Sequence, residues 1–192
     1  MIIVTGLGRC GTTLVMHMLD KAGVPLLGDA QYPDYEYSAE FDILDAALVE
    51  KNLQNKSDFA FKILHPPLFD RLRLNNNTKI ILLKRDFKQQ TLSQIKFAKL
   101  HDVEIKQKAK YEKLLKRDFF ILQSKIKRFE SLTINFEDLI TEPGYQAHRI
   151  TGFINKKGNE NIMGNCVIKR TVKNYPGFLE LQLLKINYKQ IK

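Results

Sequence analysis

The chain has 192 residues, of which 44% are hydrophobic and 27% charged, and this composition fits one globular domain over residues 1–192. Lysine and arginine number 31 against 21 acidic residues, and the formal charge of +10 favours an anionic partner without distinguishing a nucleic acid, an acidic membrane or a phosphorylated ligand. No apolar run approaches the roughly 18 residues of a membrane span, and only Cys10 and Cys166 are present, which excludes a disulfide framework. We expect a protein of the reducing cytoplasm without a signal peptide.

The first predicted elements are a strand, a glycine-rich loop and a helix. Residues 2–5 form a β-branched run typical of a strand, and the apolar spacing from Thr12 onward predicts a helix that closes at Gly23. Residues 29–40 are expected to form a polar, aromatic loop, and residues 41–53 show the spacing of a second helix.

The rest of the chain alternates strands with helices. Strands are predicted at 59–64, 79–84 and 131–136, helices at about 88–101, 107–130 and from 136 to about 154, and a surface loop at 156–165. Strands that alternate with helices indicate βαβ units. The expected fold class is therefore α/β, with a central parallel sheet between two layers of helices.

The loop after the first strand has the spacing of a phosphate-binding loop. It reads Gly6-Leu-Gly-Arg-Cys-Gly-Thr-Thr13 and opens directly into a helix, as the pattern G-x-x-x-x-G requires. Glycines allow successive N–H groups to point inward, and the helix N-terminus adds partial positive charge where an anion would bind.

This loop departs from that of nucleotide-hydrolysing enzymes. Thr12 stands where such loops have a lysine, and a cation appears earlier, as Arg9. The strand at 79–84 is followed by Arg85 before Asp86, which is typical of an anion ligand rather than of a magnesium site. A small-molecule or nucleotide kinase on the same architecture remains the alternative.

Three segments together resemble the sulfotransferase family. Arg9-Cys-Gly-Thr-Thr13 is similar to the family's 5′-phosphosulfate loop, with Cys10 in place of the usual serine. Arg85 and Ser93, eight residues apart, resemble its 3′-phosphate-binding pair. Residues 136–143 resemble its Tyr-Glu-Asp-Leu segment, which closes the last parallel strand.

The resemblance implies a donor, a product and a set of binding residues. The donor would be 3′-phosphoadenosine 5′-phosphosulfate (PAPS), the product PAP, and no metal would be needed. The acceptor would be a hydroxyl of a glycan, lipid or small metabolite, whose identity the sequence does not give. The implied cofactor-binding residues are Arg9, Cys10, Gly11, Thr12, Thr13, Arg85 and Ser93, with Lys169 and Arg170 in the place of a basic loop over the 3′-phosphate.

Catalysis would need Arg9 and a base for the acceptor's proton. Lys62 and His65 resemble a family segment in which a lysine and a histidine precede a proline, although here they lie three residues apart. Lys62 would stabilise the bridging oxygen of the leaving phosphate, and His65 is one candidate base. Other members use a glutamate from an earlier segment, for which Glu36 is preferred over Glu40 because its aromatic neighbours would remove it from water.

Other functions stay open at this point. A nucleic-acid-binding module is suggested by the lysine-rich region 96–128, but its apolar residues have the spacing of an amphipathic helix. We therefore expect no nucleic-acid partner. A chain that keeps the nucleotide and has lost turnover is a further alternative, and the oligomeric state is not readable.

Overall fold

The computed structural model describes residues 1–27, 29–30, 39–40, 50, 59–99 and 103–167. Its centre is a six-stranded sheet with the order β2-β3-β4-β1-β5-β6, parallel except for the β2–β3 pair. The strands are β1 (Ile2–Gly6), β2 (Asp29–Ala30), β3 (Ala39–Glu40), β4 (Ala60–Ile63), β5 (Lys79–Lys84) and β6 (Glu130–Asn135). The carboxyl ends of β1, β4, β5 and β6 therefore lie at one edge, where ligands of such sheets bind.

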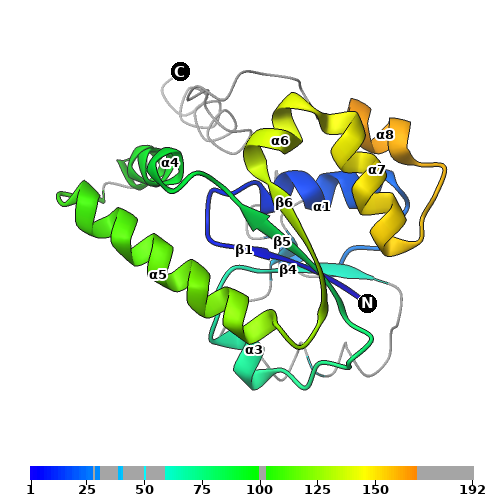
Figure 1. Cartoon of the computed structure of the whole chain (residues 1–192), viewed down its shortest axis with the longest axis horizontal. Helices are drawn as coiled ribbons and strands as arrows, with labels where there is room; N and C mark the ends of the chain where they lie inside the picture. The colour runs from blue at the N-terminus through cyan, green and yellow to red at the C-terminus, as the bar shows by residue number, and fades with distance from the viewer. Residues whose placement is uncertain (28, 31–38, 41–49, 51–58, 100–102, 168–192) are drawn as a thin grey trace.

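Helices cover both faces of this sheet (Figure 1). α1, α7 and α8 pack on one face and α3 and α5 on the other, while α4 lies beside α5 beyond the carboxyl end of β5. The helices are α1 (Thr12–Lys21), α3 (Leu68–Arg71), α4 (Phe87–Lys99), α5 (Lys108–Ile126), α6 (Phe136–Thr141), α7 (Pro143–Ile154) and α8 (Glu160–Asn165).

β5 is apolar throughout because its side chains alternate between two buried faces of the sheet. Ile81 and Leu83 pack in the cluster under α1, α7 and α8, whereas Ile80 and Leu82 pack in the cluster under α3 and α5. All four side chains are at most 2% exposed. A strand buried on both faces has no position for a polar residue, which is the reason for a continuous apolar run.

The α/β fold with a central parallel sheet is confirmed, and the main strands lie within one residue of their predicted bounds. Gly23 closes α1 in the left-handed conformation, with φ of 72°. The predicted helix at 41–53 lies outside the described residues except for Glu50, which is helical. Among the described residues, no helix is both long and apolar enough to cross a bilayer.

Three predicted segments differ from the structure, and three short elements were not predicted. The helix predicted to reach 130 ends at Ile126, because a turn follows and Glu130 already belongs to β6. The stretch from 136 to 154 is two helices, since Pro143 begins a new one. The predicted loop at 156–165 is wrong in its second half, where α8 buries Met163 against the core. The short helix α3 and the strands β2 and β3 were not predicted.

Candidate active site

The loop between β1 and α1 has no room for side chains at two of its glycines. A Cβ on Gly6 would lie 2.5 Å from Cys10 Sγ, and one on Gly11 would lie 2.6 Å from Cδ2 of Phe136. Arg9 and Gly11 both adopt left-handed conformations, with φ of 68° and 96°. The chain therefore folds back tightly before α1 begins at Thr12, as a loop that surrounds an anion must.

Side chains from α4 and from Arg85, the residue directly after β5, donate hydrogen bonds to the loop's carbonyl groups. Gln90 Nε2 donates to the carbonyls of Leu7 (3.1 Å) and Gly8 (2.9 Å). Gln94 Nε2 donates to the Gly8 carbonyl as well, at 2.7 Å, and Arg85 Nη1 donates to the Arg9 carbonyl at 2.9 Å. Three successive carbonyls are thus engaged from the side of α4, so the backbone orientation of the loop is fixed by the protein itself.

Sequence reasoning missed both glutamines. Gln90 and Gln94 are four residues apart on one helix face, and Gln90 is only 2% exposed. Their spacing predicts that both side chains lie on one face of a helix after β5, but nothing in the sequence shows which backbone carbonyls that face contacts.

Three cations lie in or around this loop: Arg9 in the loop itself, Lys62 in β4 and Arg85 directly after β5. Lys62, in β4 and 2% exposed, donates from Nζ to Oγ1 of Thr13 at 3.1 Å. The Arg85 guanidinium lies 4.4 Å from the centroid of the Phe136 ring, and the Arg9 guanidinium lies 5.0 Å from that of Phe97. Together with the N-terminus of α1, these groups provide positive charge on several sides of the loop, which suits an anion with more than one phosphate-like group.

Ser93 lies on the face of α4 that contacts the loop. It is three residues after Gln90 and four before Phe97, and both of these residues contact the loop. Its side chain is 6% exposed and that of Arg85 is 8% exposed. The structure therefore brings the predicted pair, Arg85 and Ser93, to the side of the loop that contains Arg9.

Cys10 is enclosed in protein. Its side chain has no exposed surface, and burial raises the pKa of its thiol to about 12. Lys62 and Arg85 act in the opposite direction but do not offset the loss of hydration. A ligand at this position would therefore contact the backbone N–H of Cys10 rather than its sulfur.

The segment after β6 is also connected to the loop. The ring of Phe136 lies between Gly11 and Arg85, and Glu137 Oε1 accepts a hydrogen bond from the N–H of Asp86 at 3.1 Å. From the sequence, this segment was expected only to close the last parallel strand. Its aromatic ring in fact lies against both Gly11 of the loop and the Arg85 guanidinium.

A sequence model of the family described as "Sulfotransferase domain" matches residues 1–182. The chain belongs to the sulfotransferase family. Its fold is similar to that of mouse sulfotransferase SULT7A1 complexed with PAP, with a TM-score of 0.59 and 16% identity over 86% of this chain and 62% of that one. It is also similar to the sulfotransferase domain from the curacin biosynthetic pathway, with a TM-score of 0.51 and 12% identity over 98% and 96% of the two chains. A search of curated proteins gives no match.

These likenesses are at the level of fold. The chain spans 62% of the length of the mouse protein. What this chain binds and transfers must be argued from its own residues.

Two of the three candidate bases, His65 and Glu40, lie within the described residues. His65 is exposed and follows the end of β4 by two residues. The backbone register of the sheet pairs Glu40 of β3 with Lys62 of β4, so Glu40 is the immediate neighbour of the buried lysine along the sheet. Glu36, Lys169 and Arg170 lie outside the described residues.

Asp86 caps the N-terminus of α4. Its Oδ1 accepts a hydrogen bond from the N–H of Gln89 at 2.9 Å, which caps the first turn of α4. In a kinase the acidic residue after this strand would hold magnesium. Here that carboxylate is engaged by the helix, and the described residues contain no cluster of three metal-ligating side chains.

Proposed function

We propose that the chain transfers a sulfuryl group from PAPS to a hydroxyl group of a carbohydrate, lipid or small-metabolite acceptor. The observation that supports this most is the loop of residues 7–11. Its carbonyls at residues 7–9 accept hydrogen bonds from Arg85, Gln90 and Gln94, it contains Arg9, and Lys62 donates to Thr13 directly after it. Such a site presents donors and positive charge to an anion. The mouse relative is complexed with PAP, which is the product expected here.

The N-terminus of α1 would hold the phosphosulfate end of the donor. In this proposal the N–H groups of Gly11, Thr12 and Thr13 and the threonine hydroxyls bind its oxygens, and Arg9 neutralises its charge. Arg85 and Ser93 would bind the 3′-phosphate, since an arginine leaving a strand and a serine in the second turn of the next helix can reach one phosphate. Lys169 and Arg170 remain predicted contributors.

The transfer step needs a proton acceptor and a stabilised leaving group. The acceptor oxygen forms a bond to sulfur as the bond from sulfur to the bridging phosphate oxygen breaks, and the acceptor's proton passes to the base. Lys62, which already donates to the hydroxyl of Thr13, would stabilise the bridging oxygen. His65, Glu36 and Glu40 are the candidate bases.

The donor site can be tested without knowing the acceptor. We expect calorimetric titration to show binding of PAP and much weaker binding of adenosine 5′-monophosphate, which lacks the 3′-phosphate. Ser93→Ala should weaken PAP roughly tenfold and leave the monophosphate unchanged, because one charge-assisted hydrogen bond is lost. Equal weakening of both nucleotides would remove Ser93 from the 3′-phosphate site. Preference for magnesium-ATP over PAP would support a kinase instead.

The catalytic residues require a turnover assay with labelled PAPS. Arg9→Ala should lower the rate of sulfuryl transfer by about two orders of magnitude or more. The control is Arg73→Ala, which removes an exposed arginine that is not among the predicted site residues and should leave the rate unchanged. His65→Ala and Glu36→Gln, measured separately, distinguish the two preferred bases, and Glu40→Gln follows if both keep full activity. Near-normal turnover in Arg9→Ala would contradict the proposed role of the loop.

A further inference from the structure

The outer face of α5 combines exposed apolar and basic side chains. The helix buries Leu115, Phe119, Leu122 and Ile126 against the sheet. On its other side, Leu114, Phe120 and Ile121 are 36%, 63% and 42% exposed. Single exposed apolar side chains are common on soluble proteins, so three large ones on one helix are an observation that needs an explanation.

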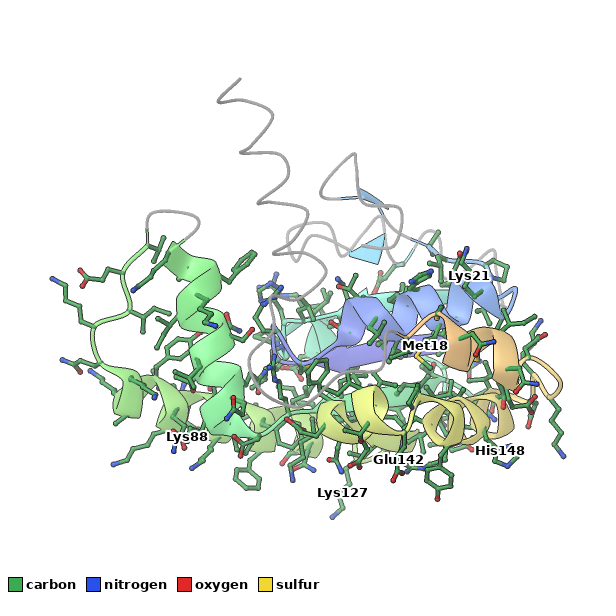
Figure 2. All side chains as sticks on the ribbon, turned by 90° about the horizontal axis from the view of Figure 1, so that it is seen from above. Met18, Lys21, Lys88, Lys127, Glu142 and His148 are labelled. Carbon is green, nitrogen blue, oxygen red and sulfur yellow. The ribbon has the colours of Figure 1, made fainter. Side chains whose placement is uncertain are left out.

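Basic residues surround these apolar side chains. At 100° per residue, Lys110 and Lys113 fall on the arc of the helix opposite Phe119. Lys127 and Arg128 follow in the turn after the helix ends at Ile126, and all four side chains are exposed. Figure 2 shows Lys127 extending away from the ribbon at the end of α5.

The acidic residues in and around α5 do not cancel this charge. Each is in an ion pair, with partners that lie outside the group of four cations: Glu112 with Lys116, Asp118 with Arg117, Asp70 with Lys125 and Glu130 with Lys79. We use the name outer α5 face for Lys110, Lys113, Leu114, Phe120, Ile121, Lys127 and Arg128. This face has net positive charge and runs along the outside of the molecule, where Figure 1 shows no described element beyond it.

We propose that the outer α5 face binds the chain to an anionic lipid bilayer. A helix lying in the membrane interface places its apolar side chains at the boundary of the acyl chains and its cations among the lipid phosphates. The outer α5 face offers both groups over a helix about 28 Å long. A nucleic acid would satisfy the cations but leave Phe120 and Ile121 in contact with a polar backbone, so the apolar members favour lipid.

The absence of tryptophan from the chain provides a direct probe. Phe120→Trp places a single indole in the centre of the outer α5 face, and Tyr145→Trp places one on α7, where the side chain is 61% exposed. With vesicles of phosphatidylcholine and phosphatidylserine in equal parts, the emission of the Phe120→Trp protein should shift to the blue, and that of the Tyr145→Trp protein should not. Vesicles of phosphatidylcholine alone should produce little shift in either.

Second substitutions in the Phe120→Trp protein separate the apolar and basic contributions. Ile121→Ser should weaken partitioning to the anionic vesicles about tenfold, and Lys113→Gln about fivefold. The matched controls are Ile162→Ser and Lys156→Gln, which change exposed residues of α8 and of the turn before it and should change partitioning less than twofold. Far-UV circular dichroism checks that each variant is folded.

Four results would overturn the proposal. The first is no blue shift with anionic vesicles, and the second is an equal shift with neutral ones. The third is binding that Ile121→Ser leaves intact and an oligonucleotide competes away, which would indicate a nucleic-acid surface. The fourth is a blue shift without vesicles together with a dimeric mass by light scattering, which would show that a second copy covers this face. None of these results depends on sulfuryl transfer.

Discussion

Gly11 and Gly23 both have positive φ, but their surroundings differ. Gly11 has φ of 96° and lies against the Phe136 ring, whereas Gly23 has φ of 72° and nothing within 4 Å of the position of a Cβ. The first glycine is required by both backbone conformation and space, and the second by backbone conformation alone. This pair allows the two requirements to be separated.

Gly11→Ala should destabilise the protein more than Gly23→Ala and should abolish nucleotide binding. We expect Gly23→Ala to lower the free energy of unfolding by about 1 kcal/mol, from backbone strain. Gly11→Ala adds a steric conflict with Phe136 and should lower it by about 3 kcal/mol. Urea unfolding and PAP titration measure the two effects. Equal losses of stability would mean that the ring of Phe136 moves aside freely.

Cys10 should make the stability of the fold fall at alkaline pH. Burial raises the pKa of its thiol from 9.0 to about 12, so the unfolded chain releases this proton before the folded chain does. The stabilisation is therefore complete below pH 9 and is lost as the pH rises toward 12, by at most about 1.4 kcal/mol per pH unit.

The contribution of Cys10 is isolated by comparing Cys10→Ala with the parent in urea unfolding below and above pH 9. The advantage of the parent over the variant should shrink as the pH rises. Cys166→Ala is the control, because that thiol is only half buried and the rise in its pKa, again from loss of hydration, is smaller. In the folded protein at neutral pH, iodoacetamide should modify Cys166 and spare Cys10. Rapid modification of Cys10 would show that the loop opens.

At the scale of single elements, α4 links the anion site to the sheet. Asp86 caps its first turn, and the face that contains Gln90, Ser93 and Gln94 lies against the loop after β1. The position of this helix therefore sets the geometry of the loop. A substitution of the residue that caps α4 should mainly lower the free energy of unfolding.

Substitutions at Asp86 distinguish a helix cap from a metal ligand. Asp86→Ala should lower the free energy of unfolding by about 1 kcal/mol, whereas Asp86→Asn should lower it much less, because asparagine caps helices nearly as well. Sulfuryl transfer should persist in Asp86→Asn. Loss of all activity in Asp86→Asn with unchanged stability would point to a metal-binding carboxylate and against the proposed function.

The elements predicted from the spacing of apolar residues are those long enough for that spacing to repeat. The six residues of β5 were found as a continuous apolar run, and α5 shows its pattern over 19 residues, whereas α3 and α8 have four and six residues, which is less than two helical turns. Arg85 was predicted as an anion ligand from its place directly after β5 and from the resemblance to the family's arginine–serine pair. Gln90 and Gln94 were missed because an amide side chain has no spacing signature, and only the packing of α4 against the loop gives it a role.

At the scale of the whole molecule, the two hydrophobic clusters share the strands between them. Ile80 and Ile81 are neighbours in β5, both with no exposed surface, and they face opposite clusters. A sheet that is common to both clusters should couple their unfolding. The prediction of one domain over residues 1–192 can be tested through this pair.

Ile80→Ala and Ile81→Ala should each lower the free energy of unfolding by about 2 to 5 kcal/mol, through lost burial and a remaining cavity. Each should also shift the same single transition, seen at one midpoint by far-UV circular dichroism and by tyrosine fluorescence. Ile162→Ala, at a position 52% exposed, should change stability by less than about 0.5 kcal/mol. Two separate midpoints in either core variant would divide the chain into two folding units.

The hydrogen bonds from Gln90, Gln94 and Arg85 to the loop have a consequence for how quickly the donor is captured. Because they are made within the folded chain, the loop does not have to give up conformational freedom when the nucleotide arrives. Association is then governed by diffusion and by attraction between opposite charges. The observed association rate should fall as the ionic strength rises, and it should increase linearly with nucleotide concentration without reaching a plateau.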